Sequence, residues 1–204
     1  MPITYGMAGS ERGDEHNMMT HVGTMTVETD RLLLRKFAYS DDESMLKNWV
    51  ADEKVQAMYA EPIYTTKEAV RGLLDKYIGG YESPNYYRWA IFEKGGAECI
   101  GQIAYFLMDD KNHFGEVEYC IGDAFQRKGY ATEATKAAIA YGFDQVGLHK
   151  VQISHMSNNI PSRKVIEKCE FCYEGTQRDY FYMDGKYVDR LFYSILEEEY
   201  HTMK

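Results

Sequence analysis

The sequence predicts a layered α+β domain in which a mixed, mostly antiparallel sheet of about seven strands is flanked by about four helices. Three observations lead to this fold class. The chain has 204 residues, 45% hydrophobic and 27% charged, which suits one compact domain with a sizeable core. Apolar and polar residues alternate over 116–121, as in a strand. From Ala131 onward, apolar residues recur at helical spacing instead.

The first part of the domain is predicted to contain one strand and two helices. The segment 29–35, with Leu32-Leu33-Leu34 at its centre, is a strand candidate. Ser40-Asp41-Asp42-Glu43 behind it is typical of a helix start. Thr65 or Thr66 can cap a second helix, which Gly79-Gly80 ends.

Three consecutive strands come next, over 87–92, 99–107 and 116–121. A hairpin turn at Gly95-Gly96 joins the first two, and a second turn leads into the third. We therefore expect an antiparallel meander that delivers the chain to a turn at Gly129.

The last part of the domain follows the long helix that begins after this turn. A short alternating strand is predicted over 150–154, and Pro161 suits an early position in the next helix. Strands over 171–182 and 187–196, joined at Asp184-Gly185, form a predicted final hairpin.

Residues 1–25 show no usable period, so we expect a loosely held N-terminal extension before a single domain over 26–204. No apolar run approaches the about 18 residues of a membrane-spanning helix, and no signal-peptide pattern opens the sequence. A cytoplasmic protein is expected.

The charge balance bears on possible partners. A net charge of -9 and a pI near 5.2 disfavour nucleic acids and anionic membranes and favour cationic substrates. The four cysteines are too few and too unevenly spaced for a disulfide scaffold. Cys169-x-x-Cys172 lacks a second pair with ligand spacing, so buried thiols are expected and no metal.

The run Gln126-Arg127-Lys128-Gly129-Tyr130-Ala131 joins the third meander strand to the long helix. A helix N-terminus presents unpaired N–H groups and a positive dipole end, so a phosphate ester can bind there. The run matches neither the Walker loop nor the dinucleotide fingerprint. The alternative is a simple turn, the commoner role of such a glycine.

Five segments agree in order and spacing with a known family. These are TDRLLLR at 29–35, GEVEYCI at 115–121, QRKGYATEA at 126–134, NIPSRKVIEKCEF at 159–171 and EGTQRDYF at 174–181. Together they resemble the RimJ/RimL branch of the GNAT N-acetyltransferases. Glu170 departs from the pattern, because the family usually has a glycine there. A Cβ at this position implies a less permissive backbone at the helix stop.

The resemblance implies the GNAT fold, with the strands 116–121 and 150–154 splayed apart to admit the pantetheine arm of acetyl-CoA. It also implies an N-acetyltransferase that moves the acetyl group from this co-substrate directly to a primary amine. The acceptor expected first is a protein α-amino terminus, such as that of a ribosomal protein. The alternatives are a polyamine, an amino acid or an antibiotic as acceptor, or a CoA-binding module without catalysis. The expected state is monomer or homodimer.

Residues that bind the co-substrate follow from the matched motifs. Backbone N–H groups of the turn would hold the pyrophosphate, and Arg127 and Lys128 would add positive charge. Asn159 would bond the pantetheine and Arg163 would reach a phosphate. The alternatives are a solvated helix face for the basic side chains and a loop-turn role for Asn159. The expected set is Tyr119, Cys120, Ile121, Gln126, Arg127, Lys128, Gly129, Tyr130, Ala131, Asn159 and Arg163.

Acetyl transfer requires a neutral amine and a protonated leaving thiolate. Glu116 and Glu118 share one strand face about 7 Å apart, and either could accept a proton directly or through water. Glu116 matches the more usual family glutamate, and Glu118 could instead bind the substrate ammonium. Ser162 matches the serine near the CoA sulfur and is the expected proton donor. The alternatives are exposed strand carboxylates and a serine that bonds the helix backbone.

Overall fold

The computed structural model describes residues 19–59 and 61–203, so residues 1–18 of the expected N-terminal extension lie outside the described residues. The strands are β1 (Val27–Glu28), β2 (Leu32–Arg35), β3 (Tyr87–Glu93), β4 (Cys99–Asp109), β5 (Phe114–Ile121), β6 (Lys150–Met156), β7 (Cys172–Met183) and β8 (Lys186–Leu196). The helices are α1 (Asp42–Met45), α2 (Glu53–Tyr59), α3 (Lys67–Gly80), α4 (Tyr130–Tyr141), α5 (Ile160–Lys168) and α6 (Glu197–Met203). Wider π turns extend α1 over Leu46–Val50 and α4 over Gly142–Val146.

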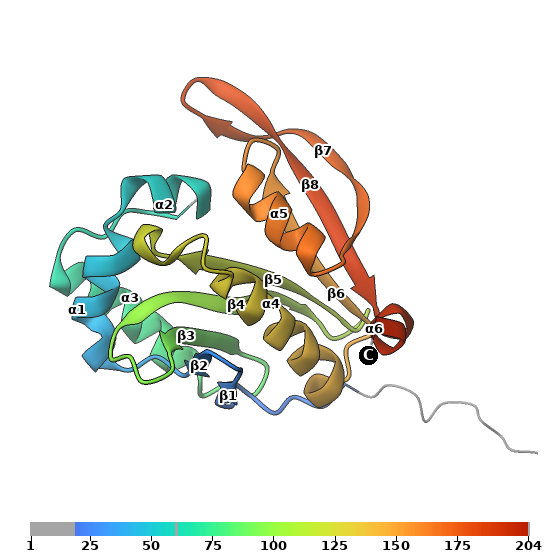
Figure 1. Cartoon of the computed structure of the whole chain (residues 1–204), viewed down its shortest axis with the longest axis horizontal. Coiled ribbons are helices and arrows are strands. Elements are labelled where there is room, and N and C mark those ends of the chain that lie inside the picture. Colours follow the sequence, from blue (N-terminus) through green and yellow to red (C-terminus); the bar gives the residue numbers. More distant parts are fainter. Residues whose placement is uncertain (1–18, 60, 204) are drawn as a thin grey trace, which may run out of the picture.

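The strands form one eight-stranded sheet in the order β1-β2-β3-β4-β5-β6-β8-β7 (Figure 1). β5 and β6 pair in parallel, and the other neighbours pair antiparallel, so the predicted mixed sheet and meander are confirmed. The structure adds β1 and the short helices α2 and α6. These elements are too short for their apolar residues to show a clear period.

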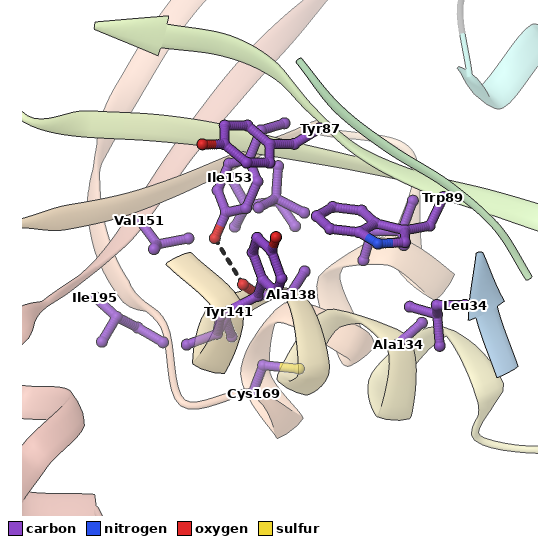
Figure 2. Packing of buried hydrophobic residues seen from close by; sticks show 14 of the residues in the cluster. Leu34, Tyr87, Trp89, Ala134, Ala138, Tyr141, Val151, Ile153, Cys169 and Ile195 are labelled. Carbon is purple, nitrogen blue, oxygen red and sulfur yellow. Dashed lines mark hydrogen bonds between the residues drawn. The ribbon is translucent and has the colours of Figure 1, made fainter. Parts of the chain in front are cut away.

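Helices cover the two faces of the sheet and create two cores. On one face, Ala134 and Ala138 of α4 pack against Trp89 and Ile153 of the sheet (Figure 2). Ile166 of α5 belongs to the same core. The other core, between the sheet and α1 to α3, contains Met45, Trp49, Val50, Val55, Val70, Leu73, Leu74, Ala90, Phe92, Cys99 and Cys120. Alternation along β5 sends Val117 and Ile121 to the α4 core and Cys120 to the other core. Glu116 and Glu118 therefore lie on the face of the sheet opposite α4.

The sheet splits between its two parallel strands. β5 and β6 pair from Phe114↔Lys150 to Val117↔Ile153. Beyond this point β5 stays paired with β4, whereas β6 stays paired with β8. The two strands thus separate after the pair Val117↔Ile153, which confirms the predicted splayed sheet.

The helix α5 stops at Glu170, which has a φ of +65°, in the left-handed region that favours glycine. The Phe171 N–H bonds the Ile166 carbonyl, and the Glu170 N–H bonds the Glu167 carbonyl. This is the Schellman pattern, and buried Ile166 and Phe171 supply its apolar contact. The chain therefore adopts the glycine-type stop in spite of the glutamate.

Residues 19–25, part of the segment expected to be loosely held, are attached to the domain. Thr24 is buried. Its hydroxyl donates to the Tyr86 carbonyl at 2.8 Å and accepts from the Arg88 N–H at 3.1 Å. The Trp89 indole N–H donates to the Met25 carbonyl at 2.6 Å. Within residues 19–59 and 61–203, no helix combines the length and apolar character needed to cross a membrane.

Candidate active site

The turn between β5 and α4 presents its backbone to an anion. Gly129 caps α4 with a φ of +86°, and Arg127 has a φ of +60°. Such left-handed residues direct neighbouring N–H groups to one side, beside the unpaired N–H groups of the first helical turn. A Cβ at Gly129 would be strained and would meet Arg31 Nη2 at 3.3 Å. Backbone of this kind can hold an anion, as the sequence predicts for this turn.

Arg31, in the turn before β2, holds this loop in place. Its Nη1 donates to the Lys128 carbonyl at 2.9 Å, and its Nε donates to Glu133 at 2.7 Å. The Thr29 hydroxyl donates to the same carboxylate at 2.6 Å. Burial raises the pKa of Glu133, but the hydrogen bonds from Thr29 and Arg31 and the charge of Arg31 outweigh it and lower this pKa. The first strands and α4 are thereby joined beside the turn 126–131.

Some side chains of the turn form hydrogen bonds within the domain, and others are exposed to solvent. Gln126 Nε2 donates to the Ile121 carbonyl at 2.9 Å and so braces the turn from within. The Tyr130 hydroxyl donates to a carboxylate at the end of β3. Arg127 and Lys128 are exposed, as side chains that reach a phosphate must be.

The last residues of β5 enter the splay. Cys120 and Ile121 are buried and point into opposite cores, and burial raises the pKa of the Cys120 thiol. Tyr119 and Ala131 are partly buried against the α4 core. These side chains are committed to packing, so the expected contact of 119–121 with pantetheine would be made by backbone groups.

Glu116 lies in a saturated buried network. It is 3% exposed, and its Oε1 accepts from Ser154 Oγ at 2.6 Å and from Arg190 Nη2 at 2.7 Å. Its Oε2 accepts from Gln152 Nε2 at 3.0 Å. Arg190 in turn donates to Ser154 Oγ and to the Tyr180 hydroxyl. The carboxylate thus ties β5 to β6 and to the final hairpin.

Glu118 lies in a separate network that faces α2. Its Oε1 accepts from Arg88 Nη2 at 2.8 Å, and its side chain is 23% exposed. Arg88 also donates to Gln102, whose amide donates to the Tyr59 hydroxyl at 2.6 Å. Burial, and then the charge of Glu118, raise the pKa of Tyr59 well above its usual value. The same two causes raise the pKa of Glu61, so the charge of Glu118 reaches a second carboxyl group here.

The residues expected after β6 meet at the start of α5. Asn159 caps this helix by accepting from the Ser162 N–H at 3.1 Å, and its Nδ2 reaches the Met58 carbonyl at 3.4 Å. The Ser162 hydroxyl lies 3.0 Å from the Tyr119 hydroxyl. Arg163 is exposed and pairs with Glu167 at 2.8 Å. Asn159 thus caps the helix, and Arg163 pairs with a neighbour on its own helix.

The cysteine pair of the sequence does not assemble a site. Cys169 is buried, and burial raises the pKa of its thiol to about 12, whereas Cys172 is exposed. In the part of the chain that the structure describes, no three His, Cys, Asp or Glu side chains converge to hold a metal ion.

The sequence did not indicate the roles of three arginines, each of which bonds to a predicted site residue. Arg31 holds the turn 126–131, Arg88 holds Glu118, and Arg190 holds Glu116. A usable signal existed for Arg88 and Arg190, because each lies within a predicted strand. A half-buried charge in a strand requires a charged partner. Periodicity alone could not identify that partner.

Comparisons with known proteins agree with this geometry. Residues 31–172 match the family model of the acetyltransferase (GNAT) domain. The chain is similar to the uncharacterized N-acetyltransferase p20 of Bacillus licheniformis, with 29% identity over 178 residues, 86% of this chain and 98% of the relative. It is also similar to the ribosomal protein uS5-alanine N-acetyltransferase of Escherichia coli strain K12, with 24% identity over 181 residues, 84% and 91% of the two chains.

A solved structure shows the same fold. The acetyltransferase (GNAT family) from Bacillus anthracis superposes with a TM-score of 0.76 and 28% identity, covering 86% of this chain and 100% of that one. The family match spans the splay, the turn 126–131 and the start of α5. The chain therefore belongs to the GNAT acetyltransferase family and is an acetyl-CoA-dependent N-acetyltransferase.

Proposed function

We propose that the chain transfers the acetyl group of acetyl-CoA directly to the N-terminal α-amine of a protein. One observation carries the proposal. The phosphate-binding turn at the start of α4 follows a splayed strand, and Glu118 lies on that strand just beyond its last pair with β6. The donor's phosphates and a proton acceptor for the amine can thus be held by one continuous segment.

Acetyl-CoA supplies the acetyl group as a thioester. The residues of the chain must hold and orient it, and positioning of this kind contributes much of a transfer rate. We assign the pyrophosphate to the backbone of 126–131, with Arg127, Lys128 and Arg163 adding charge. We assign the pantetheine to the backbone of 119–121 and to Asn159.

Glu118 is the better proton acceptor of the two glutamates. Its side chain is 23% exposed, whereas that of Glu116 is 3% exposed with both oxygens occupied by donors. In direct transfer the amine nitrogen bonds the carbonyl carbon and the carbon–sulfur bond breaks. The amine loses a proton to Glu118, directly or through water, and the departing sulfur receives one with the help of Ser162.

The surroundings of Glu118 favour a cationic acceptor. Burial and the negative charge of Glu118 both raise the pKa of Glu61, and an ammonium group would relieve this repulsion. The hairpin of β7 and β8 extends beyond the rest of the sheet (Figure 1) and exposes Tyr180, Tyr182 and Tyr187. Tyrosines on an open hairpin can contact an extended peptide. The similarity to the uS5-alanine enzyme also supports a protein terminus.

Release of CoA thiol with a panel of acceptors tests the proposal. The panel pairs peptides with free and blocked N-termini, and adds a polyamine, an amino acid and an aminoglycoside. We expect turnover that requires the free α-amine, with a higher kcat/KM for peptides than for small amines. Turnover confined to small amines would contradict the protein acceptor.

Substitutions distinguish catalysis from CoA binding alone. Glu118→Gln is expected to lower kcat about 100-fold, the usual contribution of a positioned acid or base, while acetyl-CoA affinity stays within twofold. Exposed Glu43→Gln is the matched control. Acetyl-CoA binding without turnover of any acceptor would favour the non-catalytic module instead.

A further inference from the structure

Ser162 is fixed at its backbone and contacted at its hydroxyl from another element. Its N–H is held by Asn159 in the first turn of α5. Its Oγ lies 3.0 Å from the hydroxyl of Tyr119, which belongs to β5. Val117 is the last residue of β5 that pairs with β6, and Tyr119 lies two residues beyond it. The hydroxyl pair therefore links β5, one arm of the splay, to the helix that follows the other arm, β6.

At 3.0 Å either of these two hydroxyls can donate to the other. The Tyr119 hydroxyl also lies 3.5 Å from the Ser162 carbonyl, which can only accept. The phenol has one hydrogen, and its contact with Ser162 Oγ, at 3.0 Å, has the better hydrogen-bond distance of the two. Burial raises the pKa of Tyr119, so the phenol stays protonated and remains a donor across the working pH range.

We propose that Tyr119 is a positioning residue that donates to Ser162 Oγ and leaves the serine hydrogen free to bond the sulfur of CoA. The inference rests on the proposed function of this splay and adds a role for Tyr119 beyond packing. Without the phenol, the serine hydroxyl can rotate and bond its own helix backbone, as serines near helix starts do. The contact to sulfur would then be lost although Ser162 is unchanged.

The sulfur contact can be measured without turnover. Calorimetry gives the affinities of CoA and of desulfo-CoA, which lacks the sulfur, for the wild type, Tyr119→Phe, Ser162→Ala and the double variant. We expect the wild-type preference for CoA over desulfo-CoA to fall about 2- to 10-fold in each single variant, the range of one hydrogen bond. We expect the double variant to be no lower than Ser162→Ala, because both changes remove the same bond.

Tyr141→Phe is the matched control. It also removes a buried phenol hydroxyl, which donates to the Gly23 carbonyl away from the splay, and should leave the CoA preference unchanged. As a second measurement, difluorotyrosine at position 119, at a pH low enough to keep the phenol protonated, makes the phenol a stronger donor. The CoA preference should then rise.

Two results would overturn the inference. A Tyr119→Phe variant that keeps the full CoA preference, or losses that multiply in the double variant, would show that Tyr119 does not act through Ser162. These results leave the proposed function intact. Failure of the wild type to bind either ligand would instead overturn the proposed function together with the inference.

Discussion

Glu116 accepts a hydrogen bond from Arg190 at 2.7 Å, with side chains only 3% and 15% exposed. The pair joins the splayed strand β5 to the final hairpin. Glu116→Ala would leave the Arg190 charge buried and unpaired, and we expect a loss of about 3 to 5 kcal/mol in the free energy of unfolding. Denaturant unfolding measures this loss.

The double variant Glu116→Gln/Arg190→Met removes both charges and should recover most of this stability. Glu167→Gln, in the exposed pair with Arg163, is the control and should cost about 0.5 kcal/mol or less. A single variant as stable as the wild type would show that the pair does not hold β5 to β8.

Arg31 supports the turn 126–131, the proposed phosphate site, through its bonds to Lys128 and Glu133. Arg31→Ala should weaken acetyl-CoA binding about 3- to 10-fold, because the loop loses a charge-assisted anchor. Calorimetry measures the affinity. Lys94→Ala is the matched control, since it removes an exposed positive charge that pairs with Glu28. Equal affinities for both variants would exclude the anchoring role.

Glu170 adopts a left-handed backbone at the end of α5, with a φ of +65°. Glu170→Gly removes this strain, and we expect a gain of about 1 kcal/mol in the free energy of unfolding. Glu167→Gly, inside the same helix, should instead lose about 1 kcal/mol. A denaturation midpoint that falls for Glu170→Gly would contradict this account of the helix stop.

His155 introduces a dependence of stability on pH. It is 5% exposed, and burial lowers its pKa below the usual 6.5, because the charged form loses solvation. The unfolded chain therefore binds this proton at higher pH than the folded chain. The free energy of unfolding should fall as the pH falls below about 6.5, by up to about 1.4 kcal/mol per pH unit.

Unfolding measured between about pH 5 and 7 tests this contribution. His155→Gln should flatten the slope in this range, and exposed His149→Gln controls for the loss of one imidazole. A slope that His155→Gln leaves unchanged would assign the pH dependence to other groups.

The local elements of this fold were largely predictable, and the pairing of charges was not. Alternation over 116–121 predicted β5, Thr66 caps α3 as expected, and Gly129 caps α4. These features depend on neighbours in the sequence. The bonds from Arg88 to Glu118 and from Arg190 to Glu116 join residues 30 and 74 positions apart. No periodicity reports such a pairing, so the sequence placed both glutamates on one face without showing their different environments.

The family that the sequence resembles usually has glycine at position 170, and the structure shows why this chain can have glutamate there. The Schellman bonds and the packing of Ile166 and Phe171 hold the left-handed backbone in place. Tertiary contacts here offset a local preference, which a reading of the sequence alone could not weigh.

The central claim is that the turn over 126–131 holds the phosphates of acetyl-CoA. Calorimetric titration of acetyl-CoA into the wild type, Gly129→Val and Gly95→Val tests it most directly. Gly95 also has a positive φ, +78°, in the β3–β4 turn, so its variant carries a similar strain elsewhere. We predict binding to the wild type and to Gly95→Val, and at least about tenfold weaker binding to Gly129→Val, about 1.4 kcal/mol. Equal binding to all three proteins, or none to the wild type, would contradict the account.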